Sequence, residues 1–228
     1  MAHDFEVRME VELDASPEQV WEAIASGPGI DSWFMGRSQV EARQGGAVRT
    51  DLGGYVQESV VTAWEPRKRF GYRTERGDDG SFLALEWIIE GREGASTVVR
   101  SVGCGFIGND DWEAEYHSLK AGGAFYFHNL SQYLTYFAGR TGTPVEAAVP
   151  LRDAMRLWPV LKQGLGLPDT VAVGDQVRLT PAGLAPVEGV VDYSTPEFLG
   201  VRTDNGLYRF FPAGGGVIAA CRRGVVGA

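Results

Sequence analysis

Histidine and cysteine are the side chains best suited to acid–base, nucleophilic and metal chemistry, and here their spacing supports none of these. His117 and His128 share one face of a predicted helix, but about 16 Å of helix separates them, so they cannot hold one metal ion. Both lie off the apolar stripe of that helix, and we expect them on the surface or in packing contacts. Cys104 and Cys221 are too far apart for a metal motif, and Cys104 has no neighbouring base or positive charge in the sequence to activate it. The sequence therefore predicts neither a bound metal nor a catalytic imidazole.

A glycine pattern, Gly103-Cys104-Gly105-Phe106-Ile107-Gly108, fits the G-x-G-x-x-G of dinucleotide-binding loops. That function also needs a parallel strand after a short crossover helix. Here a run of antiparallel strands precedes the pattern and one long helix follows it. We therefore expect the end of a strand, whose glycines let the helix pack closely, and no nucleotide cofactor.

Aromatic and small residues are the best candidates for a binding site. Tyr and Trp need partners for their polar atoms when buried, so a cavity lined by them suits a planar ligand. Ser101 and Gly103 share a strand face opposite Gly122-Gly123, and small residues there leave room rather than fill it. The alternative is that the aromatic residues simply fill the core. The candidate ligand-binding residues are Trp33, Tyr72, Trp87, Ser101, Gly103, Trp112, Tyr116, Leu119, Gly123, Phe127 and Leu130.

The elements that position these residues follow from periodicity. The segment 5–13 alternates apolar and polar residues, which predicts a half-buried strand. Ser16 and Pro17 then mark the start of a helix that stops at Gly27-Pro28-Gly29, before a short second helix that carries Ile30, Trp33 and Phe34. Closely spaced turn signals up to about residue 104 favour an antiparallel meander.

A long helix follows from Asn109-Asp110-Asp111 to about Phe137. One stripe of this helix must face a core; it consists of Trp112, Tyr116, Leu119, Gly123, Phe127, Leu130, Leu134 and Phe137. Because the meander is the only large partner, we predict an α+β helix-grip fold, in which a curved antiparallel sheet wraps a long helix. A weaker stripe on the back of the helix carries Phe125, Asn129, Gln132 and Tyr136.

The last third of the chain repeats parts of the first half in the same order. The segment 71–77 is similar to 200–206, and 58–61 is similar to 188–191. We therefore predict a helix-grip domain over 1–142 and a truncated repeat of the same unit over 143–228, with a helix at Trp158 and strands near Val177, Val190, Val201 and Tyr208–Phe211. Without a long helix of its own, this small sheet needs cover, either from the back of the long helix at Phe125 and Tyr136 or from a second chain in a homodimer.

The strand over 5–13, followed by Ala15-Ser16-Pro17-Glu18-Gln19-Val20-Trp21, resembles the opening of the START-like (SRPBCC) helix-grip superfamily. Thr97-Val98-Val99 through Gly105-Phe106, with Asp111-Trp112 and the long helix, resembles its branch related to the activator of a heat-shock chaperone ATPase, which is also described as polyketide-cyclase-like. The resemblance implies a cavity between sheet and helix for apolar or amphipathic small molecules. The sequence departs from that branch at Ala121-Gly122-Gly123-Ala124, where related helices usually carry a Gly-Trp pair, and in its appended repeat.

Three functions are compatible with this interpretation. The first is non-catalytic binding of a small apolar or aromatic ligand in the hydrophobic cavity. The second is a polyketide cyclase- or dehydratase-type enzyme that uses Tyr116, or a cavity carboxylate such as Glu86, as acid or base. The third is a chaperone-related protein-interaction module.

Net charge and composition limit the classes of molecule that the protein is expected to bind. The 228 residues carry 21 Lys and Arg against 30 Asp and Glu, a net charge of −9, which argues against binding to nucleic acid or to anionic membranes. No apolar run approaches the roughly 20 residues of a transmembrane helix, and the N-terminus does not resemble a signal peptide. We therefore expect a cytoplasmic protein, without membrane insertion, whose partner is a small hydrophobic or aromatic molecule.

Overall fold

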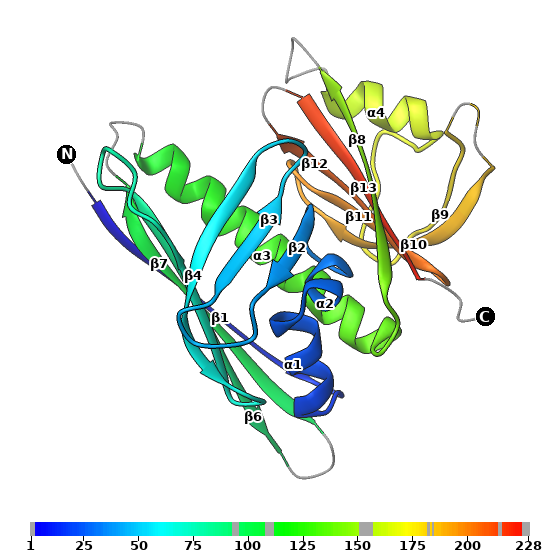
Figure 1. Ribbon diagram of the computed structural model, residues 1–228. Coiled ribbons are helices and arrows are strands. Elements are labelled where there is room, and N and C mark those ends of the chain that lie inside the picture. The colour runs from blue at the N-terminus through cyan, green and yellow to red at the C-terminus, as the bar shows by residue number, and fades with distance from the viewer. Residues whose placement is uncertain are drawn as a thin grey trace. The chain divides into compact units, whose positions relative to one another are not determined.

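The computed structural model describes residues 3–92, 96–107, 112–150, 157–181, 183, 185–213 and 216–224. The chain forms two compact units, Met1–Thr141 and Gly142–Ala228. Both units combine helices with an antiparallel sheet, which confirms the predicted α+β class (Figure 1). Each unit is described by itself.

The first unit is built on a seven-stranded antiparallel sheet with the order β1-β7-β6-β5-β4-β3-β2. Its strands are β1 (His3–Leu13), β2 (Arg37–Val40), β3 (Ala47–Asp51), β4 (Val56–Glu65), β5 (Arg69–Thr74), β6 (Phe82–Gly91) and β7 (Thr97–Ile107). Alternation in β1 puts Phe5, Val7 and Met9 on one face and charged residues on the other, as predicted. The first strand pairs with the last one, β7, so the sheet is a meander whose end returns to its start.

Two short helices follow β1, namely α1 (Pro17–Ala25) and α2 (Gly27–Asp31). Ser16 caps α1 in a capping box with Gln19, as its position before Pro17 predicts. The expected boundary of α2 is wrong, because Gly27-Pro28-Gly29 lies inside the helix and Trp33 comes after its end. The physical reason is close packing: a Cβ on Gly29 would lie 1.9 Å from the carbonyl oxygen of Glu22 in α1.

The long helix α3 (Trp112–Phe137) crosses the inner face of the sheet beside β1 (Figure 1). It ends at Phe137 as predicted, and Gly139 follows with a φ of 78°. The expected cap at Asn109-Asp110-Asp111 lies outside the described residues. The Trp112 ring stacks on the ring of His3, with the two centroids 3.9 Å apart. Further along, the rings of Trp87 and Phe127 lie parallel, with centroids 6.0 Å apart. The start of α3 therefore lies beside the start of β1, and Gly123 lies beside Met9, so the helix and the strand run in the same direction.

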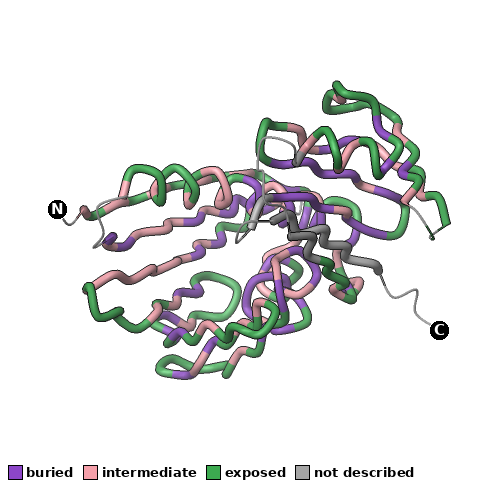
Figure 2. The backbone as a smooth tube through the Cα atoms, turned by 90° about the horizontal axis from the view of Figure 1, so that it is seen from above, coloured by how far each residue is buried: buried purple, intermediate pink, exposed green. Residues whose placement is uncertain are grey.

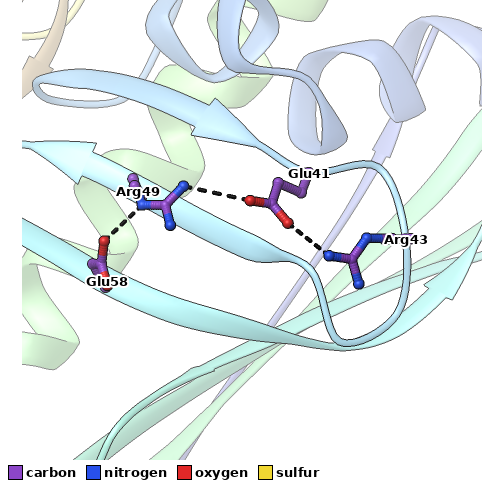
Figure 3. Close-up of polar contacts among 4 residues, drawn as sticks. All are labelled: Glu41, Arg43, Arg49 and Glu58. Atoms are coloured by element: carbon purple, nitrogen blue, oxygen red, sulfur yellow. Dashed lines mark hydrogen bonds and ion pairs between the residues drawn. The ribbon is translucent and has the colours of Figure 1, made fainter.

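The opposite face of this sheet is charged and solvated. Figure 3 shows one group of ion pairs there, in which Arg49 contacts Glu58 at 2.6 Å and Glu41 at 3.4 Å, and Arg43 contacts Glu41 at 3.0 Å. These side chains are 43 to 67% exposed, so each pair adds little to stability. The pairs mark the solvent side of the sheet, which leaves the face beneath α3 as the side of the core.

The second unit is a six-stranded antiparallel sheet with the order β8-β13-β12-β11-β10-β9 and one described helix, α4 (Leu157–Leu165). The strands are β8 (Gly142–Pro150), β9 (Gln176–Leu179), β10 (Val187–Ser194), β11 (Leu199–Thr203), β12 (Gly206–Ala213) and β13 (Gly216–Gly224). The predicted helix and four strands are present, whereas β8 and β13 were not expected. The core of this unit consists of Leu165, Leu167, Leu179, Val191, Leu199, Val201 and Phe210, with Trp158 packed against it.

The two sheets share their strand order. The strands β8, β9, β10, β11, β12 and β13 have the same neighbours as β1, β3, β4, β5, β6 and β7, and β2 has no counterpart among the described residues. In β4 the register shifts directly after Val61, and in β10 it shifts directly after Val191. The Gly45-Gly46 turn makes two backbone hydrogen bonds to Val61, and the Gly174-Asp175 turn makes the same two to Val191. These details are what a repeat requires, and the repeat itself stays a prediction.

The face of the second sheet away from this core is also buried. It carries Leu207 and Phe211 together with an ion pair, in which Arg209 contacts Asp192 through two hydrogen bonds of 2.8 and 2.7 Å. A Cβ on Gly200 would lie 2.6 Å from the guanidinium of Arg209, so glycine makes room for the pair. Buried charges are tolerated when they are paired and hydrogen-bonded, and Arg209 and Asp192 meet this condition.

Candidate functional site

The predicted ligand-binding residues come together between the sheet and α3, but they differ in burial. Five of them are almost completely buried at the end nearer to α1 and α2, namely Trp33, Trp87, Ser101, Phe127 and Leu130. Trp33 donates its indole N–H to the carbonyl oxygen of Ala23 at 2.9 Å and packs edge-on against Trp87, with centroids 5.9 Å apart. These contacts are those of a packed core, so this end is closed.

The other six predicted residues are only half-buried, and they lie toward the N-terminal half of α3. They are Tyr72, Gly103, Trp112, Tyr116, Leu119 and Gly123. On β1, the residues on the same face are half-buried as well, whereas the buried residues of α3 all lie in its C-terminal half (Figure 2). Solvent therefore reaches the inner face at this end.

Glycines widen the space at the half-buried end. A Cβ on Gly103 would have no neighbour closer than 3.9 Å, where it would meet the Leu85 side chain and the Val7 carbonyl oxygen. A Cβ on Gly123 would meet only the terminal methyl of Met9, at 3.5 Å. Neither glycine is forced by close backbone approach, so a larger side chain would enter the space between α3 and the sheet.

The sheet presents the predicted residues in two neighbouring rows. One row runs across the strands through Tyr72, Leu85, Gly103 and Val7, and the next row runs through Phe70, Trp87, Ser101 and Met9. The rows are about 7 Å apart along the strands. The half-buried row therefore lies directly beside the closed, aromatic row.

Two hydroxyl groups belong to these rows. Although the Tyr72 side chain as a whole is half-buried, desolvation of its phenol raises the pKa to about 12, because the charged form loses its hydration. Ser101 is completely buried, and its Oγ has no hydrogen-bond partner in the part of the chain that the structure describes. Both groups are therefore neutral at physiological pH and lie among apolar side chains.

Glu86, the carboxylate expected in the cavity, lies on the other face of the sheet. It follows the alternation of β6, in which Leu85 and Trp87 face α3. Its carboxylate accepts a hydrogen bond from Arg69 at 2.6 Å on the solvated face. The expectation of a cavity carboxylate at this position is therefore wrong.

The glycine pattern at 103–108 belongs to a strand, as predicted. Its described part, Gly103–Ile107, continues β7 and pairs antiparallel with both β1 and β6, and Gly108 lies outside the described residues. Cys104 is half-buried and free. Within the described residues, no group of three or more His, Cys, Asp or Glu side chains could hold a metal ion.

Sequence reasoning missed the contribution of β1. Phe5 lies edge-on to Tyr116, with centroids 6.2 Å apart, and Met9 lies against Gly123. The alternation of β1 identified the apolar face that these residues share, but it could not show that α3 would run along this strand.

Comparisons with known proteins agree with this fold. A family described as "Polyketide cyclase / dehydrase and lipid transport" matches residues 4–124, within the first unit. The crystal structure of the di-domain ARO/CYC BexL, from the BE-7585A biosynthetic pathway, is similar over 96% of this chain and 83% of its own, with 13% identity and a TM-score of 0.51. That likeness concerns the fold alone.

Two further structures are similar over part of the chain. One is a protein of Mesorhizobium loti, with 21% identity and a TM-score of 0.49 over 57% of this chain and 96% of that protein. The other is the Aha1 dimer of Colwellia psychrerythraea, with 18% identity and a TM-score of 0.49 over 59% and 99%. Comparison with curated proteins found no match. Among the described residues, none of the helices has the length and apolar character needed to cross a membrane.

Proposed function

The chain belongs to the polyketide cyclase/dehydrase and lipid transport family, and from that premise we propose that its first unit binds a small apolar or aromatic molecule between the sheet and α3, without catalysing a reaction. The observation that carries the proposal is the incomplete burial of apolar side chains that face each other across the fold, such as Phe5 and Tyr116. Protein interiors are normally close-packed. Apolar surface left open inside a fold is what a hydrophobic ligand covers.

The proposed site has a closed end and an open end. Trp33, Trp87, Phe127 and Leu130 form the closed end, and their packed side chains give the site an apolar floor for a planar ligand. Tyr72, Gly103, Trp112, Tyr116, Leu119 and Gly123 line the open end, and Ser101 lies between the two. In this arrangement the ligand enters beside the N-terminal half of α3.

Binding is favoured over catalysis by the groups on the inner face. General acid–base catalysis works best with a group whose pKa lies near the operating pH. Burial moves the pKa of Tyr72 to about 12, away from that range, and Glu86 lies on the opposite face in an ion pair with Arg69. Tyr116 remains the one acid that we proposed for a cyclase- or dehydratase-type reaction.

A pair of glycine variants tests the site. Gly123→Leu places a side chain in the space beside Met9, whereas Gly122→Leu, about 100° around the helix, enters space with no atom within 4 Å of the new Cβ. Both changes add the same side chain to α3 and improve its helix propensity equally. We expect Gly123→Leu to lower the affinity for Nile red at least tenfold and Gly122→Leu to leave it unchanged, as measured by fluorescence titration.

The outcome can contradict the proposal in two ways. If the wild-type chain does not bind Nile red, the apolar site is wrong. If Gly123→Leu folds, as judged by circular dichroism, and still binds the dye with unchanged affinity, the ligand lies elsewhere.

A further inference from the structure

Ser101, on the inner face of β7, has a buried hydroxyl without a hydrogen-bond partner among the described residues. The residue is 0% exposed, and Oγ makes no hydrogen bond to any part of the chain that the structure describes. Thr97, four residues earlier on the same strand face, shows the usual solution, since its hydroxyl donates to the carbonyl oxygen of Ala15 at 2.6 Å. Buried hydroxyls are normally satisfied, and an unpaired one costs stability. The exception at Ser101 therefore calls for an explanation.

None of the described groups around Ser101 forms a hydrogen bond with its hydroxyl. Its direct neighbours across the sheet are Met9 on β1 and Trp87 on β6, and Val99 precedes it on the same face. In the other direction along β7 comes Gly103, about 7 Å away, where the space is open. The hydroxyl thus lies at the border between the closed aromatic end and the open end of the proposed site.

We infer that the ligand places a carbonyl or hydroxyl oxygen against the Ser101 hydroxyl, so that the site takes planar molecules with an oxygen substituent and holds plain hydrocarbons more weakly. The inference rests on the proposed function and adds the chemical class of the ligand. A serine hydroxyl both donates and accepts, so it pairs with a ketone as well as with a phenol. The rings of Trp87 and Phe127 contact the planar body, and the Gly103 space admits it.

Specificity follows from the same physics. A site with a buried hydrogen-bonding group discriminates against an analogue that leaves this group unpaired. Tyr72, two strands away in the neighbouring row, offers a second neutral hydroxyl on the same face. A ligand with two oxygen substituents would hydrogen-bond to both Ser101 and Tyr72, and a ligand with one oxygen would hydrogen-bond to Ser101 alone.

Two probes of the same shape test the inference. Naphthalene and 1-naphthol differ by one hydroxyl group, and their dissociation constants are measured by displacement of Nile red. We expect the full wild-type chain to prefer 1-naphthol, and we expect Ser101→Ala to reduce the ratio of the two affinities by about three- to tenfold, which is what one hydrogen bond supplies. Ser131→Ala is the matched control, because that hydroxyl bonds to the Phe127 carbonyl oxygen within α3 and does not belong to the sheet.

A stability measurement separates this role from a structural one. If Ser101 serves the ligand, the thermal midpoint of ligand-free Ser101→Ala should equal or exceed that of the wild type, because an unpaired polar group has been removed. An unchanged affinity ratio in folded Ser101→Ala, or a lower midpoint with equal loss of both probes, overturns the inference alone. If neither probe nor Nile red binds the wild-type chain, the proposed function is wrong as well.

Discussion

On the inner face of the first sheet, the loss of hydration determines the protonation state of Tyr72. Desolvation of the Tyr72 phenol raises its pKa to about 12. A phenol that stays protonated acts as a hydrogen-bonding group and as apolar surface, which suits a binding site better than proton transfer.

The shifted pKa of Tyr72 predicts a pH dependence of stability. Unfolding returns the phenol to its ordinary pKa of 10.0. The folded state holds the proton more tightly, so the stabilisation is complete below about pH 10 and is lost as the pH rises toward 12. Between pH 9 and pH 11 we expect the free energy of unfolding to fall by about 1.4 kcal/mol more in the wild type than in Tyr72→Phe, as measured by urea denaturation. Equal slopes for the two proteins would show that Tyr72 is hydrated in the fold.

Helices and strands of the first unit are positioned by a few close approaches. Gly29 lets α2 contact the backbone of α1, and Ser16 fixes the start of α1 by its capping box. Together these contacts hold Trp33, which lies just after α2, against Trp87 of the sheet. The closed end of the proposed site is therefore a product of helix packing.

A pair of alanine variants tests this packing. Gly29→Ala places its Cβ 1.9 Å from the Glu22 carbonyl oxygen, so α1 and α2 must separate, and we expect a loss of about 1 to 3 kcal/mol. Gly122→Ala, in the open part of α3, removes the helix penalty of glycine and should add up to about 1 kcal/mol. Both effects are measured from urea transitions followed by tryptophan fluorescence. A Gly29→Ala variant as stable as the wild type would contradict the close approach of the two helices.

At the scale of the whole molecule, the two units differ in how their sheets are covered. In the first unit one face carries ion pairs in solvent and the other lies beneath α3. In the second unit α4 packs on one face, yet Leu207, Arg209 and Phe211 on the other face are buried too. A sheet with two apolar faces needs cover on both.

This difference predicts the behaviour of the isolated second unit. We propose that the face of Leu207 and Phe211, which has no described helix of its own unit on it, needs cover from outside the unit. We therefore expect a fragment of residues 142–228 to be partly unfolded or self-associated. Urea denaturation and analytical ultracentrifugation measure both properties. Sedimentation of the full chain then separates the two sources of cover that we proposed, since a monomer points to the first unit and a dimer to a second chain. A fragment that unfolds cooperatively as a monomer would contradict the argument.

Local patterns in the sequence were sufficient for the elements and for the fold class. Alternation in β1, the Ser16-Pro17 start of α1 and the apolar stripe that ends at Phe137 all predicted what the structure contains. These signals depend on neighbours within one strand or a few helical turns, so a single sequence carries them. The same holds for the strands of the second unit at Val177, Val190 and Val201. The Gly174-Asp175 turn there makes the same two backbone hydrogen bonds as the Gly45-Gly46 turn of the first unit.

The placement of side chains across the fold was decided by tertiary structure alone. The sequence placed Glu86 among the cavity candidates. In the structure, the register of β6 with β5 and β7 puts Trp87 beneath α3, and the neighbouring residue Glu86 therefore lies on the solvated face, where it pairs with Arg69. The division of the candidates into a buried and a half-buried group arises because α3 approaches β1 at one end and packs with α1 at the other. Such distances between segments far apart in the chain depend on how all the elements fill space together, and no local pattern encodes them.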